Sequence, residues 1–203
     1  MHDLDFEERQ HLDAAIAWLE ANGPDDYHRV VLDFNWGEPL YLLAWIACRP
    51  DCDIATAQTI FWAAEPAAWM DEQDAIEEEP NGYSYLNREL CIAIAERVAA
   101  GGYTRSEINF EPDVWTKSAF VELENIQQGL SRPNFRNAAE LIANRRGRTV
   151  ENDADFYRRY PSHLHHSASI ELPGDTPKSL DLMARVSEVE QTTRSNLPAW
   201  LRI

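Results

Sequence analysis

The feature that most constrains the fold is a pair of apolar segments with helical periodicity, residues 39–49 and 54–64, separated by a short polar turn. In the first, "PLYLLAWIACR", apolar side chains recur every three or four residues, which is the spacing of one helix face. Pro50 ends this segment, and Asp53 stands where it can cap the next one, "IATAQTIFWAA". A connection as short as "RPDCD" places consecutive helices side by side, so the sequence predicts an antiparallel helical pair.

The same spacing recurs along most of the chain. It predicts further helices over residues 6–21, 25–34, 83–100, 112–129, 133–147, 153–161 and 176–193. Gly23 can adopt a positive φ and end the first of these, and Gly147 is expected to cap the helix over 133–147. The stretch "TRSE", residues 104–107, also matches a capping box, but Pro112 limits any helix that follows it and is the better start for the helix over 112–129.

Strand-like alternation is weak throughout, so the expected fold class is all-α: a compact multi-helix domain of antiparallel helices with a C-terminal helical extension. The chain has 203 residues, 44% of them hydrophobic, which is enough to bury a core within one domain. We expect residues 1–150 to form the helical domain. Residues 151–203 are expected to add a loop and a C-terminal helix that pack on the same domain.

The charge of the chain is strongly negative and unevenly placed. The net charge is −17; residues 1–100 hold 21 Asp and Glu against 5 Lys and Arg, whereas residues 101–203 hold 14 against 13. Such a field repels nucleic acid and anionic membranes and attracts cationic partners. Direct nucleic-acid binding and membrane binding are therefore not expected. The small basic stretch "RRGR", residues 145–148, suits the C-terminal end of a helix and can also pair with acids of the first half.

The acid excess is densest in "MDEQDAIEEEPNG", residues 70–82, which contains six acids and no Lys or Arg. A solvated face, a metal site and a surface for a basic partner are alternative readings of such a run. The neighbouring aromatic residues favour a partner, because acids can attract a basic protein at long range and aromatic rings can then anchor it. The predicted partner-binding residues are Trp69, Asp71, Glu72, Asp74, Glu77, Glu78, Glu79, Tyr83 and Tyr85.

No motif names a reaction. The sequence lacks "GxSxG", "GxGxxG" and "GxxxxGK", and its three cysteines, Cys48, Cys52 and Cys91, have no disulfide or zinc spacing, so they are expected to be buried hydrophobic residues. We therefore predict no enzyme activity, no catalytic residues, no metal and no cofactor. The alternative is a metal-dependent hydrolase that uses the region His163–His166, where His163, His165 and His166 cluster.

The location follows from two negative observations in the sequence. The N-terminal stretch "MHDLDFEERQ" is acidic and has no apolar run, so it does not resemble a signal peptide. No stretch reaches the roughly 18 apolar residues that a membrane span needs. The expected location is cytoplasmic.

At residues 34–66, "FNWGEPLYLLAWIACRPDCDIATAQTIFWAAEP", the chain resembles DUF4274, a bacterial domain family of unknown function. The resemblance rests on Asn35 with Trp36, on the Pro-x-Cys-Asp turn at residues 50–53, and on the small-residue helix that ends in aromatics at residues 57–62. The acidic pair that usually follows the Trp is reduced here to Gly37 and Glu38. Trp36 is expected to fill a gap between helices, and Asp53 to cap a helix.

The resemblance implies no catalytic residues, but it suggests a function by analogy. Small acidic proteins of this kind resemble immunity proteins that are encoded beside secreted bacterial toxins. Together with the charge, this predicts an immunity protein that neutralises a cognate toxin, such as a basic nuclease-type effector, through an acidic surface. An adaptor in a larger assembly is a further alternative, and the oligomeric state stays open.

Overall fold

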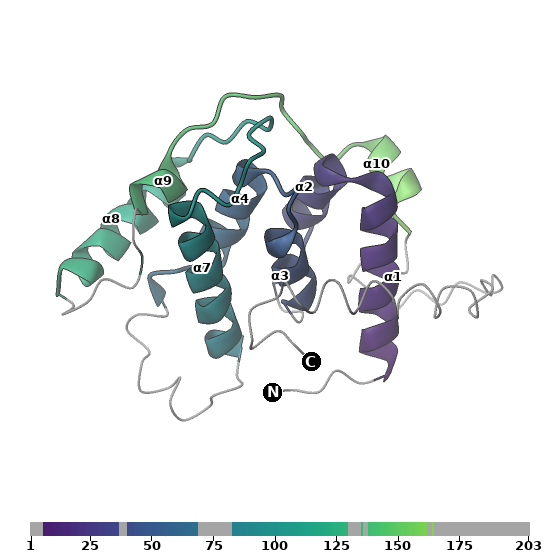
Figure 1. The fold of residues 1–203 in the computed structure, drawn as a ribbon, viewed down its shortest axis with the longest axis horizontal. Coiled ribbons are helices and arrows are strands. Elements are labelled where there is room, and N and C mark those ends of the chain that lie inside the picture. Colours follow the sequence, from purple (N-terminus) through teal and green to yellow (C-terminus); the bar gives the residue numbers. More distant parts are fainter. Residues whose placement is uncertain are drawn as a thin grey trace.

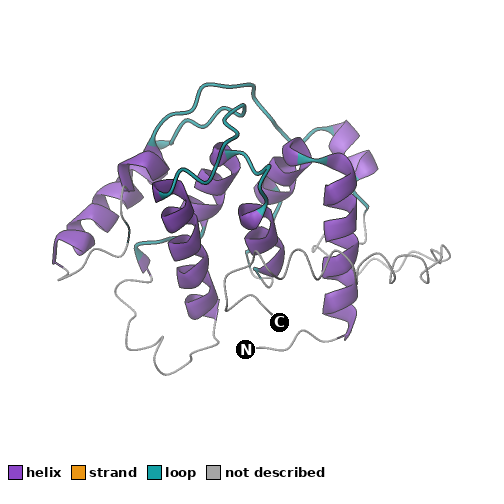
Figure 2. Ribbon diagram, in the orientation of Figure 1, coloured by secondary structure: helices purple, strands orange, loops and turns teal. Residues whose placement is uncertain are grey.

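The computed structural model describes residues 6–36, 40–68, 83–129, 135, 138–161 and 164. Within these residues the fold is all-α, as predicted, and its only β-type pairings are isolated bridges (Figures 1 and 2). The helices are α1 Phe6–Asn22, α2 Pro24–Leu32, α3 Tyr41–Cys48, α4 Ile54–Ala63, α7 Tyr83–Ala99, α8 Val114–Gly129, α9 Ala138–Ile142 and α10 Ala154–Arg159. The predicted helix over 176–193 lies outside the described residues.

Helix α4 is the central element of the arrangement, because it contacts α2, α3, α7 and α9. Helix α1 packs against α2 and α3 on one side of the molecule, while α8 and α9 pack together on the other side (Figure 1). Helix α10 lies beside the junction of α1 and α2. Two loops, residues 100–113 and 143–153, run above the ends of the helices (Figure 1). The first joins α7 to α8, and the second crosses from α9 to α10 and connects the two sides.

The core explains why the segment around α3 and α4 is so apolar. Every residue from Tyr41 to Ala47 is buried, and Leu43, Ile46, Ile60 and Phe61 have no exposed surface. Phe61 meets Phe135 edge to face, with ring centroids 5.3 Å apart. Such burial gives each large side chain a contribution of about 2 kcal/mol to folding. The sequence prediction of a buried helical pair here is correct in burial and in extent.

The turn between α1 and α2 follows from its sequence. Gly23 has φ 87°, a left-handed conformation that glycine adopts without steric cost, and Pro24 opens α2 at a position where its missing N–H is not needed. The acids Asp25 and Asp26 lie in the first turn of α2, where the helix dipole favours negative charge. Both acids are thereby placed beside the loops that run above the helices.

The predicted helix over 133–147 is wrong in its second half, because α9 ends at Ile142. The Gln58 side chain of α4 donates to the carbonyl oxygens of Glu140, Leu141 and Ala143 at 3.0, 3.1 and 3.0 Å. These bonds satisfy carbonyl groups at the end of the helix, which would otherwise need a further turn. Arg145 also donates to the Glu140 carbonyl, at 3.0 Å, so the predicted pairing of this arginine with the helix C-terminus is confirmed.

Residues 145–148 and 107–110 instead run beside each other and form backbone bridges. Arg145 and Phe110 exchange two hydrogen bonds of 2.8 and 3.0 Å, and Arg148 N donates to the Glu107 carbonyl at 2.8 Å. Gly147 does not cap a helix: a Cβ there would overlap the Glu107 carbonyl, so glycine permits this close backbone approach. The capping-box match at residues 104–107 does not begin a helix: Arg105 and Ile108 form bridges in this stretch, which belongs to the loop between α7 and α8.

Candidate functional site

The predicted partner-binding residues cannot be placed within the described part of the structure. Trp69, Asp71, Glu72, Asp74, Glu77, Glu78 and Glu79 fall outside the described residues, as do the side chains of Tyr83 and Tyr85 in the first turn of α7. His163, His165 and His166, the alternative metal-binding cluster, are also outside them. Among the residues that are described, no group of three or more His, Cys, Asp or Glu is placed to hold a metal ion.

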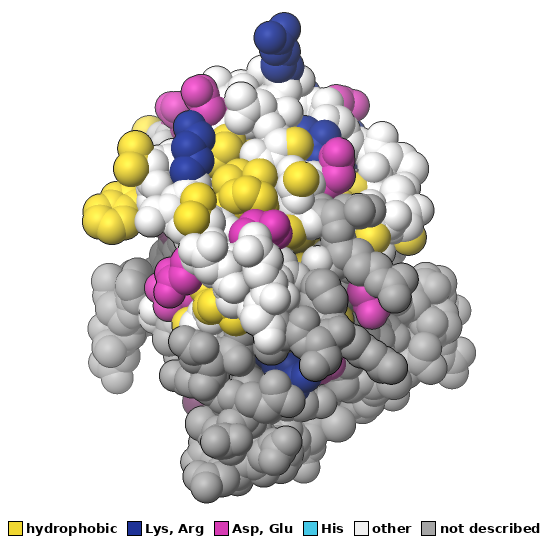
Figure 3. Space-filling model, turned by 90° about the vertical axis from the view of Figure 1, so that its left-hand side faces the viewer, with side chains coloured by type: hydrophobic (Ala, Val, Ile, Leu, Met, Phe, Trp, Pro, Cys, Tyr) yellow, Lys and Arg dark blue, Asp and Glu magenta, His cyan; other side chains and the backbone are white. Residues whose placement is uncertain are grey.

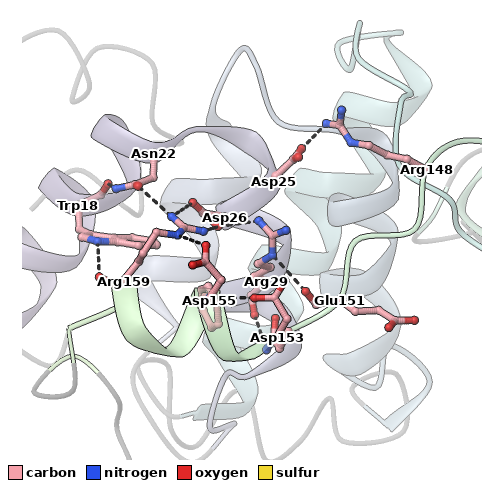
Figure 4. A network of polar contacts seen from close by, with 12 residues as sticks. Trp18, Asn22, Asp25, Asp26, Arg29, Arg148, Glu151, Asp153, Asp155 and Arg159 are labelled. Atoms are coloured by element: carbon pink, nitrogen blue, oxygen red, sulfur yellow. Dashed lines mark hydrogen bonds and ion pairs between the residues drawn. The ribbon is translucent and has the colours of Figure 1, made fainter.

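The most extensive polar site in the described part of the chain surrounds Asp26 in α2 (Figure 4). Its side chain is only 5% exposed and accepts hydrogen bonds from Arg29 at 2.8 Å and from Arg159 of α10 at 2.9 and 3.1 Å. Arg159 also donates to Asn22 and Asp155, each at 3.1 Å. Hydrogen bonding to Asp26 raises the pKa of Arg159 above its ordinary value. The buried acid is therefore fully compensated by two arginines.

Trp18 of α1 adds to the contact that holds α10 in place. Its indole N–H donates to the Arg159 carbonyl at 3.1 Å, and its ring meets Tyr160 edge to face with centroids 4.9 Å apart. Phe156, which is completely buried, stacks on Tyr160 and approaches Trp18 at 6.2 Å. These contacts combine apolar burial with hydrogen bonds, and they fix α10 on α1 and α2.

A second group of ion pairs joins α2 to the loops. Arg148 pairs with Asp25, so the predicted pairing of "RRGR" with an acid of the first half is confirmed for this residue. Arg105 lies 2.8 Å from Glu107 and 4.0 Å from Asp25. Because these side chains are partly exposed, the pairs are screened by solvent and each contributes little to stability. Their main effect is to balance the charge of α2 locally.

Asp53 is the one carboxylate in the described residues that has no exposed surface. One of its oxygens accepts from Ala55 N at 2.9 Å and caps α4, as predicted. The other oxygen accepts from Glu107 N at 2.6 Å and from Ile108 N at 3.2 Å. Arg105 lies 3.9 Å away. A single side chain thus caps a helix and holds the bridged loop, a second role that spacing alone did not indicate.

With this geometry established, the comparison with known families is informative. The model of DUF4274, a domain of unknown function, matches residues 22–99. These residues form a DUF4274 domain. Searches of curated proteins and of solved structures found no match. The match begins at the end of α1 and ends at the end of α7, so it includes the central helix α4 and its cap Asp53.

The polar sites described above join the DUF4274 domain to residues that follow it in the chain. Asp25 and Asp26 of the domain pair with Arg148 and Arg159, and Asp53 binds backbone of the loop at 107–108. These residues after position 99 therefore contribute contacts that the domain alone does not have. Trp36, whose ring meets Phe34 edge to face at 5.7 Å, packs against the core as the resemblance led us to expect.

The buried titratable groups of the DUF4274 domain are structural in character. His28 and Thr56 form a buried contact, with 3.1 Å between Nδ1 and Oγ1, and burial lowers the pKa of His28 to about 4. Burial also raises the pKa of the Cys52 and Cys91 thiols, so both are protonated at neutral pH, as expected for buried hydrophobic cysteines. Cys48 differs from the prediction, because it is only half-buried. A protonated, inaccessible thiol is a poor nucleophile.

The arginines of this region were the residues that sequence reasoning missed. The sequence predicted no role for Arg29, Arg105 and Arg159. In the structure, each of them lies against an acid of α2 or against Asp53. The available signal was the near balance of charge after residue 100 beside the large excess before it. That contrast indicates that some arginines of the second half compensate acids of the first.

No described helix has the length and apolar character needed to span a bilayer.

Proposed function

We propose that this chain is a binding protein, an immunity protein that neutralises a basic toxin such as a nuclease-type effector. The observation that carries the proposal is the placement of unbalanced charge. Residues 69–82 contain six acids and no Lys or Arg, and the nearest basic residues in sequence are Arg49 and Arg88. Such an excess favours a cationic partner over nucleic acid or an anionic membrane.

The ion pairs of the described residues add support, because they account for much of the positive charge elsewhere. The arginines that pair with carboxylates there are Arg29, Arg49, Arg105, Arg145, Arg148, Arg158 and Arg159. Within the described residues, each of these arginines lies against an acid that is not in residues 69–82. These ion pairs also limit which acids can form the proposed binding surface. Because Asp25, Asp26 and Asp53 are compensated, the acids of the first half are not equally available to a partner. The proposed surface is therefore Trp69 to Tyr85.

The physical basis of neutralisation is imitation of the toxin's own substrate. A nuclease must attract phosphate, so its active site carries positive potential. A dense group of carboxylates is attracted by that potential and increases the association rate, by 10-fold to 1,000-fold in electrostatically steered pairs. Trp69, Tyr83 and Tyr85 would then supply the apolar contacts that slow dissociation.

The proposal is tested with the product of the reading frame that neighbours this chain's gene, purified as the candidate toxin. We expect a 1:1 complex and loss of the toxin's activity in that complex. Changing Glu77, Glu78 and Glu79 to Lys should lower the association rate at least tenfold and reduce its dependence on salt.

The matched control reverses the same number of charges at Glu7, Glu96 and Glu151, which are exposed and lie on described parts of other elements. This control has the same net charge as the test variant, so it separates a local surface from the general effect of net charge. Equal rates for the two variants would remove the acidic segment as the binding site. A neighbouring product that keeps full activity in the presence of excess wild-type chain would contradict the immunity function.

A further inference from the structure

Helix α8 presents apolar side chains that the described part of the chain leaves exposed. Val114 is 80% exposed, Trp115 82% and Val121 57%, whereas Leu123 and Gln127 of the same helix are buried. A tryptophan this exposed is unusual, because its large apolar area gains stability from burial. Hydrophobic side chains are visible on the side of the molecule where α8 and α9 lie (Figure 3). We call Val114, Trp115 and Val121 the α8 surface.

The opposite side of α8 explains why these three side chains point outward. Ala119, Phe120 and Ile126 pack against the core, and Gln127 accepts a hydrogen bond from Phe135 N at 2.9 Å. Val114 and Val121 are seven residues apart, which places them two turns apart on one face. Trp115 follows Val114 directly. The α8 surface is therefore a group of three exposed apolar side chains on adjoining faces of one helix, with Lys117 between the two valines, and the other side of that helix is anchored.

The start of α8 is also fixed. Asp113 accepts a hydrogen bond of 2.7 Å from the backbone N–H of Thr116, in the first turn of α8. This hydrogen bond lowers the pKa of Asp113. Tryptophan has few rotatable bonds, so little conformational entropy is lost when it is buried in a partner. A capped helix that displays a rigid aromatic side chain has the features of an interface anchor.

The charges around the α8 surface select the kind of partner. Glu111, Asp113 and Glu122 are exposed beside it, and Lys117 is the one exposed basic residue of this helix. A second copy of the chain would bring these acids against each other, and an anionic lipid or nucleic acid would be repelled. A basic protein with an apolar depression bordered by Lys or Arg would match both the α8 surface and the acids beside it.

We propose that the α8 surface is the apolar anchor for the basic partner protein. The inference rests on the proposed binding function and adds to it a second contact region, far in sequence from residues 69–85. The acids of residues 69–82 accelerate encounter, and Trp115 with the two valines slows dissociation. Loss of a buried aromatic anchor at an interface typically weakens binding by 30-fold or more.

The first experiment identifies what contacts the α8 surface. Trp115 is replaced by the photo-crosslinking residue benzoylphenylalanine in the full chain, expressed from its own locus, and the crosslinked product is identified by mass spectrometry. The same replacement at Leu32, which is 48% exposed on α2, is the control. A basic protein linked from position 115 and not from position 32 is the expected result. A second copy, the chain's own C-terminal segment, an acidic protein or no product would overturn the proposal.

The second experiment measures the contribution of Trp115 with the crosslinked protein in purified form. Trp115→Ala should raise the dissociation rate about 30-fold and leave the association rate nearly unchanged, whereas Leu32→Ala should change neither. Because both side chains are exposed, both variants should keep the urea midpoint of the wild type, which excludes unfolding as the cause. Equal dissociation rates for Trp115→Ala and the wild type would refute the anchor.

The two proposals fail in different ways. If the purified partner binds through Trp115 but keeps its activity in the complex, the α8 surface is correct and the immunity function is wrong. If the partner is inhibited and Trp115→Ala binds as tightly as the wild type, the function is correct and the α8 surface is wrong.

Discussion

Replacing Asp53 by Ala should destabilise the protein by about 3 kcal/mol, which is roughly three times the cost of losing an ordinary helix cap. The carboxylate accepts three backbone N–H groups, from Ala55, Glu107 and Ile108. Loss of the cap at Ala55 costs about 1 kcal/mol. Each of the two loop N–H groups that loses its acceptor adds about 1–3 kcal/mol if it stays buried. Removing the desolvation cost of the carboxylate offsets part of this sum.

Asp153 offers a matched comparison, because it caps α10 by accepting from Phe156 N at 2.7 Å while its residue is exposed. Asp153→Ala removes a cap and leaves no buried loop without its acceptor, so it should destabilise the protein clearly less than Asp53→Ala does. Urea denaturation at pH 7, followed by circular dichroism, gives the free energy of unfolding of each variant. Asp53→Asn tests the same hydrogen bonds. It replaces one of the two accepting oxygens by an NH₂ group, which must then face at least one backbone N–H donor.

The reasoning has a direct readout in the loop. Amide hydrogen exchange of Glu107 and Ile108 should be slow in the wild type and should accelerate in Asp53→Ala more than exchange within α1 does. Equal destabilisation by Asp53→Ala and Asp153→Ala, with unchanged exchange at Glu107 and Ile108, would show that the bonds from Asp53 to the loop contribute nothing. Asp53 would then be a helix cap alone.

Two further predictions concern buried positions. Because burial lowers the pKa of His28 to about 4, the folded state keeps it neutral; its contribution is complete above the ordinary pKa of about 6.5 and declines as the pH falls towards 4. His28→Gln should therefore lose less unfolding free energy than the wild type between pH 7 and 4.5 in urea titrations, and parallel losses would refute this. Gly147→Ala should lower the free energy of unfolding by about 1–3 kcal/mol, because its Cβ meets the Glu107 carbonyl. Gly129→Ala is the control: its Cβ meets no atom within 4 Å, so its free energy of unfolding should stay within about 0.5 kcal/mol of the wild type. Equal melting temperatures for the two variants would contradict the close approach at Gly147.

The sequence predicted well those parts of the fold that depend on local interactions. Helices α3 and α4, the cap at Asp53 and the positive φ of Gly23 all follow from residues within a few positions of each other. Caps, turn glycines and apolar spacing act over one or two turns of helix, so they are legible in a single sequence. The packing of Cys52 and Cys91 as buried residues was predictable for the same reason.

Errors arose where distant residues decide the outcome. Helix α9 ends at Ile142 because the side chain of Gln58, more than 80 residues earlier, binds its terminal carbonyl groups. Nothing in the local stretch "ELIANRRG" signals this partner. The role of Gly147 was misread in the same way: a glycine after a basic helix end resembles a cap, but its purpose is a backbone approach to residue 107.

The same difference between local and long-range interactions applies to the two proposed binding regions. Periodicity predicted a helix over 112–129, yet it could not say which of its apolar side chains are covered, and Val114 and Val121 have the spacing of core residues. Exposure is a property of what packs against a helix, so only the three-dimensional arrangement could identify the α8 surface. The acidic segment has the opposite character, because its charge is evident in the sequence alone.

Net charge by itself is therefore a poor guide to how this molecule meets a partner. Acids of the first half that lie beside the loops are compensated: Asp26 is buried against Arg29 and Arg159, and Asp25 meets Arg148. These pairs stabilise contacts within the fold and add little to the external field, because opposite charges at such short distances cancel beyond about a Debye length of 8 Å. An acid contributes to that field in full only where no basic side chain, near or distant in sequence, lies against it. The relevant quantity is thus the charge that the fold leaves uncompensated, and residues 69–82 are where the sequence offers the least compensation.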